Sequence, residues 1–260
     1  MSPLNAFWVS VIVVIAAKTA AWALQLRTRN AGMVDAIWAL TLGGLAALYA
    51  WLGTAPAGTR ALLALMGGLW GLRLGWHLWE RNWGKPEDWR YAKFRADWGK
   101  DADWKMFFFF QFQNIFTLAL SASAFIAVAY RPDAPPAAAV VVAIAIWLMS
   151  VLGEGLADRQ MEAFRANPAN KGRVCRDGLW RYSRHPNYFF ECLHWLAYLP
   201  LAWGAPYAWA PLLAPLVMAW LLMKLSGVPM LEAEMIQRKP GYAEYVRQTS
   251  ALVPWFPKAN

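Results

Sequence analysis

The feature that most constrains this chain is the alternation of long apolar runs with short charged stretches. Several stretches of about 20 residues carry almost no charge, and the basic residues crowd between them. A helix needs about 20 mainly apolar residues to cross the hydrocarbon core of a bilayer. Backbone polar groups in lipid must be satisfied within the structure itself, so these runs predict helices. The sequence therefore predicts an all-α polytopic membrane helix bundle.

Seven transmembrane segments are expected, and the Lys and Arg residues set their orientation. The segments are Leu4–Leu26, Met33–Leu52, Arg60–Trp79, Met106–Tyr130, Pro136–Leu156, Tyr188–Trp203 and Tyr207–Leu225. The odd-numbered loops and the C-terminal tail are rich in Lys and Arg, whereas the second and fourth loops have only Arg60 and Arg131. Because basic loops stay in the cytoplasm, the N-terminus is expected outside and the C-terminus inside.

Composition supports one integral membrane domain over residues 1–260, in the cytoplasmic membrane if the chain is bacterial. Many of the 18 Trp residues lie near the ends of apolar runs, as interfacial aromatics do. The net charge of +9 does not indicate nucleic acid, because the basic residues occupy loops, where membrane lipid is the expected partner. Cys175 and Cys192 form no ligand motif and are expected to be free thiols.

Polar residues within the third segment form a stripe opposite a row of glycines. Gly67, Gly71 and Gly75 follow four-residue spacing, and the polar stripe consists of Trp70, Arg73, His77 and Glu80. At 100° per residue these two sets lie on opposite faces of a helix. The glycines are expected to pack closely against a neighbouring helix. Arg73 then either lines a binding site or reaches interfacial water, with Glu80 as a pairing partner.

Acidic residues mark two further positions. Asp35 begins the second segment, where it is either a helix-start residue favoured by the helix dipole or a buried acid with a raised pKa. At the end of the fifth segment four charged residues share one face: Glu154, Asp158, Glu162 and Arg165. That face is either solvated or a wall of a cytoplasmic cofactor pocket.

The densest polar stretch runs from Gly178 to Glu191, directly before and into an apolar segment. Its polar residues are Arg181, Tyr182, Ser183, Arg184, His185, Asn187, Tyr188 and Glu191. Pro186 suits the first turn of a helix, and a helix N-terminus beside basic side chains suits an anion. Asn187 and Glu191 are one turn apart and could bind an amide or ribose hydroxyls. No metal site is expected, because three histidines are too few for a multi-histidine iron enzyme.

The Arg184-His-Pro-Asn-Tyr-x-x-Glu191 stretch resembles the C-terminal domain of the steroid 5-alpha-reductase family, including its bacterial relatives. Two further motifs support the resemblance, Glu154-Gly-Leu-Ala-Asp158-Arg-Gln160 and Pro240-Gly-Tyr-Ala-Glu-Tyr245. The resemblance is strongest over residues 150–250. It implies NADPH as reductant and reduction of a carbon–carbon double bond conjugated to a ketone, in a 3-oxo-Δ4-steroid or similar lipophilic enone entering from the bilayer.

The resemblance also implies site residues. Residues 1–130 would supply mainly the substrate side, and residues 131–260 would supply mainly the cofactor side, facing the cytoplasm. The cofactor shell would comprise Arg73, Asp158, Arg165, Arg173, Arg181, His185, Asn187, Tyr188 and Glu191. Mammalian members polarise the ketone with a glutamate and a tyrosine, and this sequence places Asp35 and Trp70 there as catalytic residues. An indole N–H can donate a hydrogen bond but supplies no phenolic proton.

Three rival functions remain open. Isoprenylcysteine carboxyl methyltransferases use S-adenosylmethionine and have a related C-terminal architecture with an Arg-His-Pro motif. Asp158, Gln160 and Glu191 favour the reductase over them. The second rival is a non-catalytic lipid-binding or structural membrane protein, which is expected to bind no NADPH. A sterol C14-reductase-like activity would use the same cofactor on another double bond.

Overall fold

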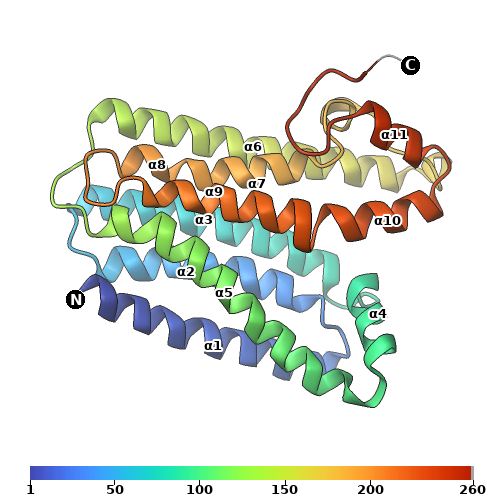
Figure 1. Ribbon diagram of the computed structural model, residues 1–260, viewed down its shortest axis with the longest axis horizontal. Coiled ribbons are helices and arrows are strands. Elements are labelled where there is room, and N and C mark those ends of the chain that lie inside the picture. Colours follow the sequence, from blue (N-terminus) through green and yellow to red (C-terminus); the bar gives the residue numbers. More distant parts are fainter. Residues whose placement is uncertain (259–260) are drawn as a thin grey trace. The chain divides into compact units, whose positions relative to one another are not determined.

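The computed structural model describes residues 1–258, which fold into helices with no strand beyond an isolated bridge (Figure 1). The all-α prediction is confirmed over this part of the chain. The chain divides into two compact units. Unit 1 comprises Met1–Pro136 and Leu201–Ala210, and unit 2 comprises Ala137–Pro200 and Pro211–Asn260. The division near residue 136 lies close to the expected change from substrate half to cofactor half, whose roles stay predictions.

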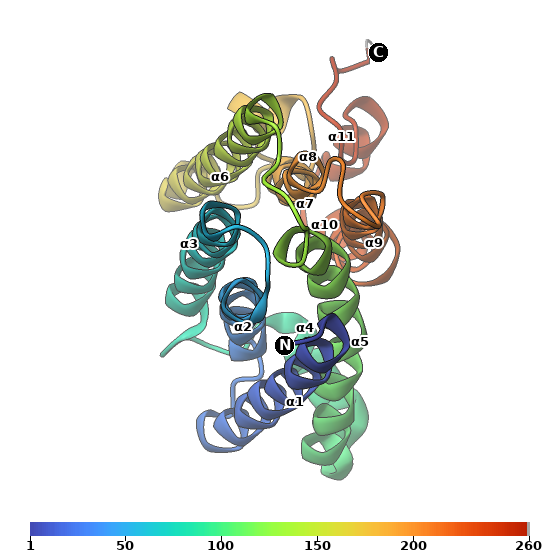
Figure 2. The ribbon, with the colours of Figure 1, turned by 90° about the vertical axis from the view of Figure 1, so that its left-hand side faces the viewer.

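Unit 1 is a bundle centred on its second helix. Its elements are α1 (Pro3–Thr28), α2 (Met33–Leu52), α3 (Ala57–Asn82), α4 (Trp89–Trp98), η1 (Gly99–Asp101) and α5 (Ala102–Ala129). Helix α2 packs against α1, α3 and α5, and Figure 2 shows it among these three helices. Half of the α2 residues are buried, as the central position requires.

The glycine row of α3 packs against α2, as the sequence predicts. A Cβ atom added to Gly71 would lie 2.6 Å from the Cα of Gly43, and one on Gly75 would lie 2.6 Å from the Leu40 side chain. Backbones approach this closely only where one helix offers no side chain. The close contact of α2 and α3 therefore depends on glycine.

A late segment of the chain, Leu201–Ala210, completes unit 1. The Arg131 side chain is 4% exposed and donates hydrogen bonds to the carbonyls of Leu201, Trp203 and Asp133. These bonds satisfy carbonyls that the surrounding loops leave without helical partners. Arg131 thus has a structural role. In the sequence it is one of only two basic residues in the second and fourth loops.

Unit 2 is built around α7. Its elements are α6 (Ala137–Ala166), η2 (Pro168–Asn170), η3 (Gly178–Arg181), α7 (Pro186–Leu196), the start of α8 (Tyr198–Leu201), α9 (Leu213–Trp220), the π-helical turn η5 (Leu221–Leu225), α10 (Val228–Arg238) and α11 (Tyr242–Gln248). Helix α7 packs against α6 and α9 (Figure 1). The Phe190 ring lies so close to Gly153 of α6 that a Cβ there would be 2.3 Å away.

Among residues 1–258, five helical stretches, two of them made of several consecutive elements, are long and apolar enough to cross a membrane. They are Pro3–Thr28, Met33–Leu52, Trp89–Ala129, Ala137–Ala166 and Ala210–Arg238. Two of the seven expected segments are not confirmed. Segment Arg60–Trp79 lies in α3, whose polar stripe reduces its hydropathy, and segment Tyr188–Trp203 breaks after α7, which is only about 17 Å long.

Candidate functional site

Residues predicted to bind a cofactor are held together in unit 2 where η3 docks on α6. The Trp180 indole donates to the Ala157 carbonyl over 3.0 Å, and the Gln160 side chain accepts from the Leu179 N–H over 2.9 Å. Gly178 has a φ of 57°, and a Cβ there would lie 2.3 Å from the Gln160 amide. Glycine is therefore required at this turn. The docking brings Arg181, at the end of η3, to the part of α6 that carries Asp158.

The first turns of α7 carry four predicted cofactor residues. His185 is the N-cap and Pro186 opens the helix, which agrees with the expected helix start. Asn187 is half-buried, and the carboxylate of buried Glu191 accepts a 3.1 Å hydrogen bond from the Trp195 indole. Asn187 and Glu191 lie on one face of α7, one turn apart. Their amide and carboxylate suit an amide or hydroxyl ligand.

Arg184 and His185 both contact Glu232 of α10. The Arg184 guanidinium forms a two-pronged ion pair with the Glu232 carboxylate, at 2.6 and 3.2 Å. Arg184 also donates to the backbone carbonyls of Val246 and Thr249. The His185 Nε2 lies 3.0 Å from Glu232, and its ring stacks on Tyr188 at 5.1 Å. Arg184 thus joins protein groups, where the sequence indicated an anion site, while His185 and Tyr188 are oriented together.

The C-terminal segment docks beside this cluster. The backbone N–H of Arg184 donates to the Ser250 carbonyl over 2.8 Å. Ser183 and Ser250 form an isolated parallel β-bridge. The Tyr245 hydroxyl donates to the carbonyls of Trp180 and Ser183. Burial raises the pKa of Tyr245 above its ordinary value, so the phenol stays protonated as these two bonds require.

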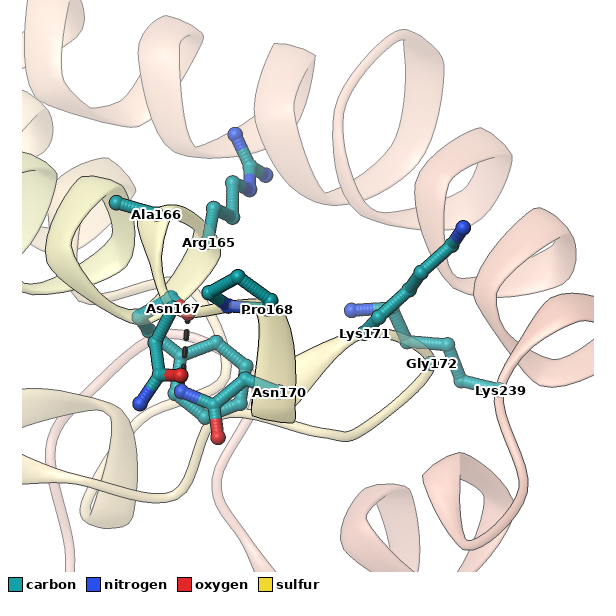
Figure 3. A pocket seen from close by; sticks show the side chains of 9 residues that line it. Arg165, Ala166, Asn167, Pro168, Asn170, Lys171, Gly172 and Lys239 are labelled. Carbon is teal, nitrogen blue, oxygen red and sulfur yellow. Dashed lines mark hydrogen bonds between the residues drawn. The ribbon is translucent and has the colours of Figure 1, made fainter.

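A cationic pocket of about 260 Å³ lies where α6 ends (Figure 3). Its lining residues are Phe164, Arg165, Ala166, Asn167, Pro168, Asn170, Lys171, Gly172 and Lys239. Arg165, a predicted cofactor residue, is one of them. The Nζ of Lys239 donates to the backbone carbonyl of Arg173 over 3.0 Å. Arg173 is another predicted cofactor residue, and this bond connects its loop to a residue that lines the pocket. Burial lowers the pKa of Lys239, and the nearby Arg165 charge lowers it further.

In unit 1, Asp35 accepts two hydrogen bonds from α4. Its Oδ1 accepts from the Tyr91 hydroxyl over 2.7 Å, and its Oδ2 accepts from Arg90 over 2.8 Å. Arg90 also pairs with Asp88 at 2.9 Å. Burial acts to raise the pKa of Asp88, but hydrogen bonds and charge from Arg90, with help from Arg81, lower it overall. Asp35 is therefore an acceptor in a charged cluster, whereas its predicted role is that of a proton donor.

The other unit 1 residues predicted for the site lie along one side of α3. Trp70 is fully buried and meets Trp38 edge to face, with ring centroids 6.4 Å apart. Arg73 follows one turn later and is half-buried. Spacing of three residues keeps both side chains on the same face.

Four residues of interest escaped the sequence analysis. Glu232 and Lys239 lie near the C-terminus, Tyr91 lies on a short helix outside the apolar segments, and Lys18 lies within the first apolar segment. Lys18 is 1% exposed, and its ammonium donates to the Gln113 amide oxygen over 2.7 Å. A lysine in the middle of an apolar run predicts a buried polar contact. This pattern could have identified Lys18 from the sequence.

No metal-binding group occurs within residues 1–258, in the sense of three or more clustered His, Cys, Asp or Glu side chains. Glu191 and His194, which have a spacing seen in some metal sites, bind other partners. The His194 Nε2 lies 3.2 Å from the Tyr198 hydroxyl, and Glu191 accepts from Trp195.

Comparison with known proteins gives one match. No curated protein and no solved structure matches the chain. Residues 21–249 match the family described as "Protein of unknown function (DUF1295)". In unit 1 the match covers every helix except the first part of α1. In unit 2 it covers every helix to the end of α11. The chain therefore belongs to the DUF1295 family.

Proposed function

We propose that this protein is a membrane-embedded, NADPH-dependent reductase of the carbon–carbon double bond of a 3-oxo-Δ4-steroid or similar lipophilic enone. The family to which the chain belongs is associated with steroid 5-alpha-reductase-like proteins. One observation carries the proposal. The first turns of α7 place half-buried Asn187 one turn before buried Glu191, beside the stacked rings of His185 and Tyr188, and this grouping of polar side chains suits a ligand.

Unit 2 offers groups that fit a phosphorylated dinucleotide. Arg165, Lys171 and Lys239 line one pocket, and cations of this kind form strong charge-assisted hydrogen bonds with phosphate. Asn187 and Glu191 offer an amide and a carboxylate for a carboxamide or ribose hydroxyls. The residues that would hold the cofactor in unit 2 are Asp158, Arg165, Arg173, Arg181, His185, Asn187, Tyr188 and Glu191. When bound, NADPH would supply a hydride for the β-carbon of the enone.

Unit 1 offers donors for the substrate ketone. Negative charge grows on the carbonyl oxygen as the double bond is reduced, and a positioned donor stabilises it. The resemblance calls for an acid and a tyrosine, and α3 has Trp70 in place of the tyrosine. The Tyr91 phenol of α4 donates to Asp35 over 2.7 Å, and this phenol would take the place of the missing tyrosine. We propose that the Tyr91 hydroxyl, which donates its one proton to Asp35 in this structure, turns that proton to the ketone oxygen when substrate binds, and that the Trp70 indole N–H donates beside it.

The proposed membrane arrangement keeps seven spans. Helix α3 has 26 residues and is about 39 Å long, which is enough to cross a bilayer despite its polar stripe. The segment of α7 and α8 would be the remaining span, interrupted at Ala197. The N-terminus would lie outside, and the C-terminus and the cofactor side would face the cytoplasm, because the basic loops cluster there.

The test is NADPH oxidation by the purified protein in detergent, with and without progesterone or testosterone. We expect steroid-dependent loss of NADPH absorbance and a product two hydrogens heavier by mass spectrometry. Thermal stabilisation by S-adenosylmethionine, with none by NADPH, would favour the methyltransferase instead. Stabilisation by neither compound would favour a non-catalytic lipid-binding protein.

A further inference from the structure

We propose that the cationic pocket at the end of α6 binds the dianion of a phosphate monoester. The phosphate would meet Arg165, Lys171 and Lys239, of which the two lysines lie outside the predicted cofactor shell. The proposal rests on three observations: the charge of the lining, the rigidity of the rim and the size of the pocket.

The lining gathers cations without an acidic residue. Its nine residues include one arginine, two lysines and two asparagines, and none is Asp or Glu. Lys239 is half-buried, and its pKa is lowered first by burial and then by the nearby charge of Arg165. Like charges held close together repel each other, and this cost falls when an anion binds between them. Figure 3 shows these side chains arriving from three different segments.

Hydrogen bonds fix the rim of the pocket. The Asn167 side chain accepts from the Ala169 N–H over 3.0 Å, and the Asn170 amide donates to the Phe164 carbonyl over 3.0 Å, drawn as a dashed line in Figure 3. The Arg173 N–H in turn donates to the Asn170 carbonyl over 3.0 Å. A rim that is already ordered loses little conformational entropy on binding, which favours affinity for a small ligand.

The pocket size selects a small phosphate. Its volume of about 260 Å³ is below the roughly 300–1,000 Å³ of pockets that enclose drug-sized ligands. A phosphate and an attached sugar fit this space better than a whole dinucleotide. Two sources have this chemistry: a nucleotide such as an adenosine 2′-phosphate, and a phospholipid with a phosphomonoester headgroup. The nucleotide source rests on the proposed function, whereas the site itself does not.

The experiment uses the full-length protein and measures binding rather than turnover. Isothermal titration in detergent compares adenosine 2′-monophosphate with adenosine, which lacks the phosphate. Native mass spectrometry of protein in phosphatidylcholine nanodiscs, with and without phosphatidic acid, tests the lipid source. The variants are Lys239→Gln and Lys171→Gln, the latter at an exposed position where folding is not at risk. The matched control is Arg238→Gln, which removes a cation that pairs with Glu234 outside the lining.

We expect both lysine variants to weaken phosphate binding about tenfold, as loss of one charge-assisted hydrogen bond does, and the control to change it less than twofold. Binding of the nucleotide identifies a soluble source, and binding of phosphatidic acid alone identifies a lipid source. Equal affinity for adenosine and its 2′-phosphate, together with no retention of phosphatidic acid, would overturn the proposal. Unchanged phosphate binding in both lysine variants would overturn it as well.

The two proposals fail in different ways. Phosphate binding that depends on Lys171 and Lys239, without steroid-dependent NADPH oxidation, would leave the pocket standing and reject the reductase. Steroid-dependent oxidation without any lysine-dependent phosphate binding would leave the reductase standing and reject the pocket.

Discussion

At the scale of single residues, the Arg184–Glu232 ion pair makes the sharpest prediction about stability. Both side chains are largely buried, at 9% and 13% exposed, so loss of either leaves an uncompensated charge. We expect Glu232→Gln to destabilise the protein by about 3 kcal/mol, as breaking a buried pair does. Glu234→Gln, which breaks a pair with the 61% exposed Arg238, should cost less than about 1 kcal/mol. Unfolding in detergent measures both, and equal costs would contradict the structural role.

The Tyr91–Asp35 pair makes the sharpest prediction about catalysis. Tyr91→Phe removes the phenolic donor and keeps the ring, so steroid-dependent turnover should fall by about 100-fold. The affinity for NADPH should stay within a factor of two, because the proposed cofactor residues are elsewhere in the sequence. Tyr130→Phe is the control, since its phenol donates to the Leu52 carbonyl over 3.3 Å. Equal turnover of Tyr91→Phe and the wild-type protein would remove Tyr91 from the mechanism.

Sequence reasoning located some of these residues and missed others for a physical reason. Asp35 and the Arg184–Glu191 stretch stood out because polar groups at membrane segments are costly. Glu232 did not stand out, because its importance comes from a partner 48 positions away. Tyr91 was missed because its short helix lies outside the apolar runs, and only folding brings it to Asp35. Pairing across distant segments leaves no local pattern.

At the scale of elements, the α2–α3 contact predicts opposite effects at neighbouring glycines. Gly71→Ala would place a Cβ 2.6 Å from the Gly43 backbone, which cannot move away without separating the helices. We expect it to lower the thermal midpoint of unfolding clearly. Gly68→Ala meets no atom within 4 Å, and alanine favours a helix over glycine by up to about 1 kcal/mol. That variant should be neutral or stabilising in the same measurement, and a reversed order would contradict the packing.

Helix positions were predictable where hydropathy alone decides them, as in α1, α2, α5 and α6. The helix bounds were predicted less accurately between α7 and α10. There the apolar segment expected over Tyr188–Trp203 ends as a helix at Leu196, and the following membrane segment includes a π-helical turn at Leu221–Leu225. Neither feature has a hydropathy pattern of its own. Both depend on packing among neighbouring helices, which composition does not encode.

At the scale of the whole molecule, the assignment of Leu201–Ala210 to unit 1 could not be predicted from apolar runs. Its bonds to Arg131 make this assignment testable. Arg131→Gln should leave the Leu201 and Trp203 carbonyls without their donor and speed proteolysis of this segment several-fold. Arg60→Gln is the matched control, because Arg60 also donates to backbone carbonyls, those of Ala55 and of Ala50 in the last turn of α2, and should leave cleavage within Leu201–Ala210 unchanged. Mapping the cleavage sites by mass spectrometry separates a local effect from general unfolding.

The same contact has a consequence for biosynthesis. The ribosome makes Arg131 first and Leu201 only 70 residues later. At roughly 5–20 residues per second, the nascent chain carries this arginine for roughly 4–14 s before its carbonyl partners at Leu201 and Trp203 exist. During that interval the side chain lacks two of the three carbonyls that it bonds in the folded protein. Unit 1 is therefore completed only after Ala137–Pro200 of unit 2 has been translated.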